Sequence, residues 1–200
     1  MEEIAPGLWH WTARHEGIGI AVSSYYLERE HVLIDPMIPP IGLGWFDQRG
    51  RPEHALLTNR HHDRHAWQLR AAFGCTVHCI SNGVHELEGR GPVETFEFGD
   101  RLPGGVTVCE VDAICPDETA LYIPSHAALA CADGVVGDAR GGRLSFVPDD
   151  LMDDPEQTKQ GLREAYRRLL ELEFELLLLA HGDPVVTGGK DALRAFVTAG

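Results

Sequence analysis

Three histidines and an aspartate lie close together in residues 56–70, which read LLTNRHHDRHAWQLR. They are His61, His62, Asp63 and His65. Imidazole nitrogens and carboxylate oxygens are the groups that bind zinc and similar metal ions in proteins. The spacing leaves two arrangements open. His61 and Asp63 converge if the segment is an extended loop, whereas His61 and His65 share one face if it is helical.

Three further segments place similar groups directly after an apolar run. The groups are Glu118, with Asp117 beside it, after VCEVDAI; Asp133 after ALACA; and His181 after ELLLLA. Two of these segments can also be explained without a metal. Asp133 precedes a glycine, as residues in turns often do, and Asp117 and Glu118 could cap a turn. Rigid strand ends are nevertheless what holds metal ligands in place, so the four segments together indicate a metal site.

The elements expected to position these segments alternate between strands and helices. Hydrophobic periodicity and turn residues predict helices at 66–73, 84–89, 156–172 and 190–198 and a helical turn at 43–48. The same patterns predict strands at 19–27, 31–35, 54–58, 76–80, 93–98, 106–111, 119–123, 127–132 and 173–180. Two pairs of these strands, 19–27 with 31–35 and 119–123 with 127–132, look like hairpins. The order therefore excludes a simple doubly wound sheet and favours layered α and β elements with much antiparallel sheet.

Composition limits the partners and the location of the protein. The chain of 200 residues carries 31 acidic and 17 basic residues, a net charge of −14, which argues against nucleic acid or an anionic membrane as a partner. The start, MEEIAPGLWHW, does not resemble a secretory signal, and the longest apolar run, residues 176–180, is far shorter than the roughly 20 residues of a membrane span. We therefore expect a cytoplasmic protein that acts on a small molecule.

Cysteines and tryptophans are expected to have structural roles. Five cysteines, an odd number, lie mostly in strand-like segments and are expected to be reduced. Cys115 near Glu118 and His126 could act as a nucleophile, but a buried structural thiol is the simpler interpretation. The tryptophans are expected in the core, with a pocket or a homodimer contact as the alternative for Trp9, Trp11 and Trp45.

The order of these features resembles the metallo-β-lactamase superfamily, which includes glyoxalase II and many metal-dependent hydrolases. The resemblance covers nearly the full length. It rests on a strand pair ending in LID at residues 33–35, a strand followed by threonine and a histidine-rich loop, a ligand before a later strand, an aspartate after the next, and a last strand ending in His-Gly. The resemblance implies one α/β domain over residues 1–200, a four-layer αββα sandwich.

The resemblance also assigns ligands, with two departures from the family's pattern. The family's loop is Thr-His-x-His-x-Asp-His, and residues 58–64, TNRHHDR, occupy that frame. Asn59 and Arg64 stand where the family has histidines, while His61 and Asp63 keep their places. The resemblance thus implies a partial metal site, with these ligands: His61, Asp63, Glu118, Asp133 and His181.

The first functional hypothesis is a metal-dependent hydrolase of a small ester, thioester, lactone or phosphodiester. The metal would be zinc, or else iron or manganese, with one ion or none expected rather than two. A bound metal of this kind lowers the pKa of water to near neutrality and so supplies a nucleophile. Asp63 would orient that nucleophile, and Asn59 or His65 would polarise the scissile group.

The second hypothesis is a non-catalytic member of the fold with a ligand-binding or structural role. A guanidinium stays protonated and does not ligate metals, so Arg64 would replace the charge of the metal beside the acidic residues. Alternatively, Arg64 does not replace the metal: its side chain turns outward, and His65 or His62 supplies the missing imidazole ligand. A nucleotide-binding oxidoreductase is rejected, because no third glycine follows Gly17 and Gly19 at the required spacing.

Overall fold

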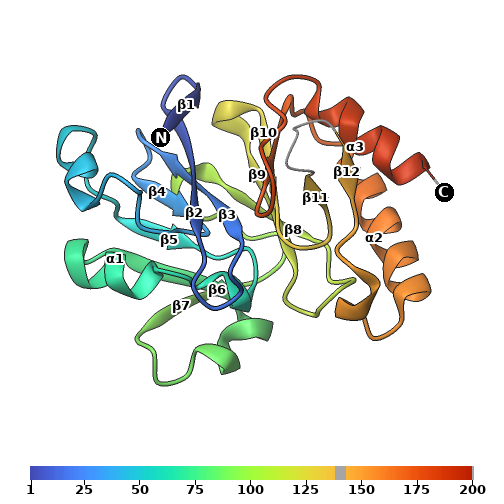
Figure 1. The fold of residues 1–200 in the computed structure, drawn as a ribbon, viewed down its shortest axis with the longest axis horizontal. Helices are drawn as coiled ribbons and strands as arrows, with labels where there is room; N and C mark the ends of the chain where they lie inside the picture. The colour runs from blue at the N-terminus through green and yellow to red at the C-terminus, as the bar shows by residue number, and fades with distance from the viewer. Residues whose placement is uncertain (138–142, 200) are drawn as a thin grey trace. The chain divides into compact units, whose positions relative to one another are not determined.

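The computed structural model describes residues 1–137 and 143–199, and the chain divides into two compact units. Unit 1 consists of Met1–Glu97 and Leu102–Gly104, and unit 2 consists of Phe98–Arg101 and Gly105–Gly200. Each unit contains both strands and helices, and the two units are described separately below (Figure 1).

Unit 1 is built on a seven-stranded sheet in which the strands follow one another in chain order. Strands β1 to β4 pair antiparallel, as expected for the hairpin at residues 19–35, but β4 to β7 pair parallel (Figure 1). Parallel pairing arises because a helical segment crosses over between successive strands, which the sequence patterns alone did not indicate. The strands are β1 (Glu2–Ala5), β2 (Leu8–Arg14), β3 (Ala21–Leu27), β4 (Val32–Ile34), β5 (His54–Leu56), β6 (Thr76–Ile80) and β7 (Val93–Phe96).

The helical segments of unit 1 lie in these crossovers. Helix α1 (Ala66–Phe73) has the predicted bounds, and Gly74 ends it in the left-handed conformation that glycine adopts easily. The short 3₁₀ helices are η1 (Leu43–Gln48), η2 (Arg60–His62) and η3 (Ser81–Leu87), and η4 (Pro103–Gly105) follows the last strand. The apolar side of α1 packs on the sheet in one core cluster with Trp11 and Trp45, which confirms core packing for these two tryptophans.

Unit 2 contains a four-stranded sheet in the order β13-β10-β9-β8. The predicted hairpin of β9 and β10 is antiparallel, whereas β13 returns parallel to β10. The strands are β8 (Thr107–Glu110), β9 (Thr119–Ile123), β10 (Ala128–Cys131) and β13 (Leu176–Leu179), with a separate pair, β11 (Val136–Gly137) and β12 (Leu144–Ser145). The 3₁₀ helices are η5 (Pro124–His126) and η6 (Asp149–Leu151).

Helices α2 (Pro155–Leu169) and α3 (Gly189–Thr198) pack together in the core of unit 2 (Figure 1). The acidic start of α2 acts as predicted, because Asp154 accepts a hydrogen bond from Gln157 N at 3.1 Å and Pro155 occupies the first helical position. The helix ends at Leu169, three residues before the predicted end. Strands β1, β2, β11 and β12 were not predicted, since β1, β11 and β12 are too short for a periodic signal and β2 mixes polar with apolar residues.

The structure bears on two expectations drawn from the composition, the state of the cysteines and the membrane spans. All five cysteines have free thiols, as expected. Within residues 1–137 and 143–199, the helices are too short or too polar for any of them to cross a bilayer.

Two histidines in contact, His54 and the buried His78, lie on neighbouring strands of unit 1. His54 Nδ1 and His78 Nε2 are 3.0 Å apart, and His78 is only 5% exposed. Burial, and then the charge of His54, lower the pKa of His78 to about 4. The folded chain therefore binds fewer protons than the unfolded chain between this pKa and the ordinary histidine value near 6.5.

We expect this pair to make unfolding pH-dependent. Since the pKa of His78 is lower in the folded state, the free energy of unfolding should fall as the pH drops from about 6.5 towards about 4. Urea unfolding at a series of pH values measures this slope. The His78→Gln variant should show a flatter slope, while His85→Gln, which removes an exposed imidazole, should leave it unchanged. Equal slopes in wild type and His78→Gln would contradict the assignment.

Candidate functional site

The histidine-rich loop of unit 1 begins directly after β5 and turns at once into η2. Asn59, at the position of a family histidine, caps η2 by accepting a hydrogen bond from His61 N at 2.9 Å. This turn points the two adjacent histidines differently, because His61 is exposed whereas His62 is only 4% exposed. The structure thus gives Asn59 a capping role, and it buries His62 in preference to His61.

His62 belongs to a buried hydrogen-bond network with Asp35 and Thr58. Its Nδ1 lies 2.9 Å from Asp35 Oδ2 and 2.8 Å from Thr58 Oγ1. The same carboxylate accepts from Thr58 N at 2.8 Å and from Thr58 Oγ1 at 2.6 Å. Burial alone would raise the pKa of Asp35, but the charge and hydrogen bond of His62, with Arg64 and Thr58 adding to them, hold it below its ordinary value.

The other predicted residues of this loop also have partners within unit 1. Asp63 Oδ2 accepts from Trp67 Nε1 at 2.9 Å and lies 3.6 Å from Arg90 Nη1. His65 Nδ1 accepts a hydrogen bond from Ile38 N at 3.0 Å. Because that nitrogen is an acceptor, the neutral His65 ring carries its proton on Nε2. The roles of Asp63 and His65 in catalysis remain predictions.

The possibility that Arg64 turns outward is not what the structure shows, because its side chain lies buried within unit 1. Its side chain is 7% exposed, and Nη1 donates to the carbonyl oxygens of Ser23 at 2.6 Å and Asp35 at 2.9 Å. The backbone at Arg64 has a φ of 36°, a conformation that non-glycine residues adopt only when the surroundings hold them there. Arg64 therefore brings a buried positive charge to the Asp35 network.

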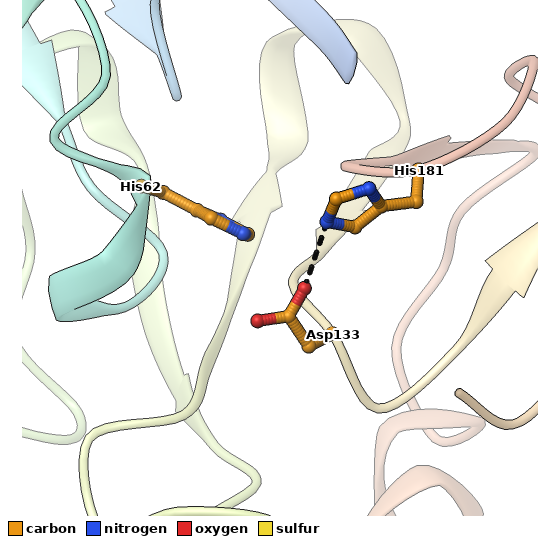
Figure 2. Close-up of side chains that lie close together, drawn as sticks. All are labelled: His62, Asp133 and His181. Carbon is orange, nitrogen blue, oxygen red and sulfur yellow. Dashed lines mark ion pairs between the residues drawn. The ribbon is translucent and has the colours of Figure 1, made fainter. Parts of the chain in front are cut away.

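In unit 2 the structure brings Asp133 and His181 together. Strands β10 and β13 are parallel neighbours, with Cys131 opposite Leu179, so the two residues follow strand ends that lie side by side. His181 Nε2 is 3.0 Å from Asp133 Oδ1, the ion pair drawn in Figure 2. The two side chains are 18% and 24% exposed, which keeps them open to solvent ions.

The backbone around His181 is held by β11. Gly137 N donates to His181 O at 2.9 Å, and Gly182 has a φ of 92°. A Cβ at Gly182 would lie 2.4 Å from Gly137 O, so no side chain fits there. The His-Gly ending of the last strand therefore has a geometric cause, namely close backbone packing directly beside the imidazole.

Glu118, another of the predicted metal ligands, is fully buried in unit 2. Its Oε1 accepts a hydrogen bond from Gly134 N at 2.7 Å, and Cys115 Sγ lies 3.9 Å from its Oε2. Glu118 thus fixes the turn that carries Asp133. The structure assigns it this support, while its role as a metal ligand remains a prediction.

Sequence reasoning gave little weight to two residues that the structure makes prominent. In the sequence, Asp35 is only the last residue of LID, and His62 is only one of two substitutes for a missing ligand. The signal for Asp35 was present, since a carboxylate directly after a buried strand needs a buried partner. Nothing in the sequence distinguishes His62 from His61, because the two adjacent histidines differ only in the direction in which the turn points their side chains.

Comparisons with known proteins place the whole chain in one fold. No protein-family model and no curated protein matches the sequence. TTHA1623, solved in a di-iron-bound form, is 25% identical, with 92% of this chain and 91% of that chain covered and a TM-score of 0.61. The DIM-1 metallo-β-lactamase is 15% identical, with 97% and 96% covered and a TM-score of 0.69.

A third solved structure is an archaeal metallo-β-lactamase superfamily protein, ST1585 from Sulfolobus tokodaii. It is 15% identical, with 96% of this chain and 85% of that chain covered and a TM-score of 0.69. These structures confirm the resemblance at the level of the fold, and with it the α/β fold class inferred from the sequence.

Proposed function

Because the chain has the metallo-β-lactamase fold, we propose that it is a metal-dependent hydrolase whose metal is held by Asp133 and His181. The observation that carries the proposal is the 3.0 Å approach of His181 Nε2 to Asp133 Oδ1 at the ends of two neighbouring strands. The substrate is a small ester, thioester, lactone or phosphodiester, in keeping with the net charge of −14 that disfavours polyanions.

The pair has the chemistry and the spacing of metal ligands. Two atoms bound to one tetrahedral zinc at about 2.0–2.1 Å lie about 3.3 Å apart. The observed 3.0 Å between the carboxylate oxygen and the imidazole nitrogen is close to this separation. One carboxylate and one imidazole suit zinc, iron or manganese. The di-iron-bound form of TTHA1623 supports iron as an alternative to zinc.

When bound, such a metal supplies a water of lowered pKa and polarises the scissile bond. The residues of unit 2 orient the two ligands. Glu118 fixes the turn of Asp133 through Gly134 N, and β11 fixes the backbone of His181 through Gly137 N. Preorganised ligands of this kind need little rearrangement when the metal binds.

Metal analysis tests the proposal. Protein purified without chelators and without a histidine tag should contain a stoichiometric amount of zinc, iron or manganese by mass spectrometry. Asp133→Ala and His181→Ala should each lose most of it, and each should lose hydrolysis of a panel of small esters, thioesters, lactones and phosphodiesters. The control is Asp183→Ala, a nearby acidic residue outside the pair. Wild-type protein that holds no transition metal, and gains none when zinc is added, would overturn the proposal.

A negative result would favour the second candidate, a non-catalytic member of the fold. The observation that speaks for it is the buried guanidinium of Arg64, which already supplies a positive charge inside unit 1. In that case Arg64→Gln should change the stability of the protein without creating metal affinity.

A further inference from the structure

Three side chains of metal-binding type lie across neighbouring strands at one edge of the sheet of unit 1. They are His54 on β5, His78 on β6 and Glu94 on β7, the last strand of that sheet. Thr76 lies opposite His54, and Glu94 lies opposite His78. Since residues two apart in a strand share a face, this parallel register places all three side chains on one face of the sheet.

The two imidazoles approach each other at nearly the spacing of two ligands on one metal ion. His54 Nδ1 and His78 Nε2 are 3.0 Å apart, and the ring planes are tilted by 50°. Two nitrogens bound to one tetrahedral ion at about 2.0–2.1 Å lie about 3.3 Å apart. A rotation of the partly exposed His54 ring therefore lets both lone pairs converge on an ion. In the absence of metal, the same spacing suits a hydrogen bond from one ring to the other.

Glu94 favours the form of His78 that a metal requires. Its Oε2 lies 3.8 Å from His78 Nδ1, the ring nitrogen that does not face His54. A carboxylate attracts the single proton of a neutral imidazole to the nearer nitrogen, which leaves Nε2 with a lone pair. A carboxylate beside one ring nitrogen and a metal on the other is the common arrangement of a histidine ligand. Glu94 is thus placed to orient His78 for binding.

We infer that His54 Nδ1 and His78 Nε2 form a metal site within unit 1, for a divalent ion that prefers imidazole nitrogen, above all Cu²⁺. Imidazole suits copper, nickel and zinc, and at a given site of this kind Cu²⁺ binds most tightly. Water completes the coordination from the side of the edge strand β7, where 71% of the Glu94 side chain is exposed. This site is separate from the metal proposed for Asp133 and His181, which belong to unit 2.

The test measures Cu²⁺ binding in full-length Asp133→Ala protein, so that the metal proposed for unit 2 contributes little. Affinity, measured by competition with a chelator, should fall at least about 10-fold when His78→Gln is added, since loss of even an outer partner of a ligand costs this much. The matched control is His85→Gln. His85 lies 3.8 Å from Glu86, as His78 does from Glu94, but it is 63% exposed and should be dispensable.

Nitrogen NMR gives a readout that does not depend on loss of a histidine. In Asp133→Ala protein, one equivalent of Zn²⁺ should shift the resonances of His54 Nδ1 and His78 Nε2 together and leave those of His85 in place. Urea unfolding gives another, because an ion that binds the folded state raises the urea midpoint. Cu²⁺ should do so in Asp133→Ala protein and not when His78→Gln is also present.

The opposite results would overturn the inference. Equal Cu²⁺ affinity with and without His78→Gln, or ring nitrogens of His54 and His78 that stay in place with Zn²⁺, would mean that the two imidazoles form a hydrogen bond only. If His78→Gln proves too unstable to study, His54→Gln takes its place, since that ring is partly exposed. The loss of metal from wild type to Asp133→Ala bears on the proposed function alone.

Discussion

Replacing Gly182 by alanine is expected to lower the free energy of unfolding by on the order of 4 kcal/mol. Two effects contribute. The φ of 92° disfavours any residue with a Cβ, and the added methyl carbon would lie 2.4 Å from Gly137 O and 2.8 Å from Gly137 Cα. These contacts are with backbone, so no side chain can rotate away to relieve them.

The Gly188→Ala variant is the matched control for this prediction. Gly188 also has a positive φ, 68°, but a Cβ there would meet nothing within 4 Å. It should therefore lose only the conformational part, about 1 kcal/mol. Urea unfolding of both variants measures the difference. Equal losses at the two positions would mean that the close contact of Gly182 with Gly137 does not exist in solution.

The same substitution should disturb the neighbouring imidazole. Gly182 follows His181 directly, and the carbonyl of His181 is bound by Gly137 N at 2.9 Å. If the backbone moves to admit a methyl group, this bond and the 3.0 Å approach of His181 to Asp133 are lost together. Any folded Gly182→Ala protein should thus bind metal more weakly than Gly188→Ala.

Much of the fold could be predicted because its signals are local. The bounds of α1 follow from apolar spacing and from Gly74, and the positions of Asp133 and His181 follow from the apolar strands that precede them. What brings Asp133 to His181 is the parallel pairing of β10 with β13. That pairing joins segments far apart in the chain, so no local pattern could predict it, and the family resemblance named the two residues as ligands without predicting how their strands pair.

The direction of side chains in the histidine-rich loop could not be predicted in the same way. Assigning ligands by their spacing in the family's motif assumes that the backbone of the loop has the same conformation as in the family. Here Asn59 starts a 3₁₀ helix, which turns His61 outward and His62 inward. The buried place of Arg64 also depends on distant partners, namely the carbonyl oxygens of Ser23 and Asp35.

Replacement of Asp35 by alanine should cost about 3–5 kcal/mol of unfolding free energy, since it leaves buried charge without its partner. Asp35 is 2% exposed, and its carboxylate accepts from Thr58 N, Thr58 Oγ1 and His62 Nδ1. The guanidinium of Arg64 would also lose the negative charge that offsets its own. Asp47→Ala removes an exposed carboxylate of the same unit and should change stability by less than about 0.5 kcal/mol.

The Asp35→Asn variant shows how much of this loss is due to charge. The amide keeps the size of the side chain and an acceptor for Thr58 N, but it does not ionise. Because the folded state holds the pKa of Asp35 below its ordinary value, the carboxylate stabilises the fold fully above about pH 4 and loses this contribution as the pH falls further. The stability difference between wild type and Asp35→Asn should therefore be largest near neutral pH and shrink in acid. A difference that stays constant from about pH 7 to about pH 3 would show that Asp35 acts by hydrogen bonding alone, without the ionised pair that fixes the orientation of His62.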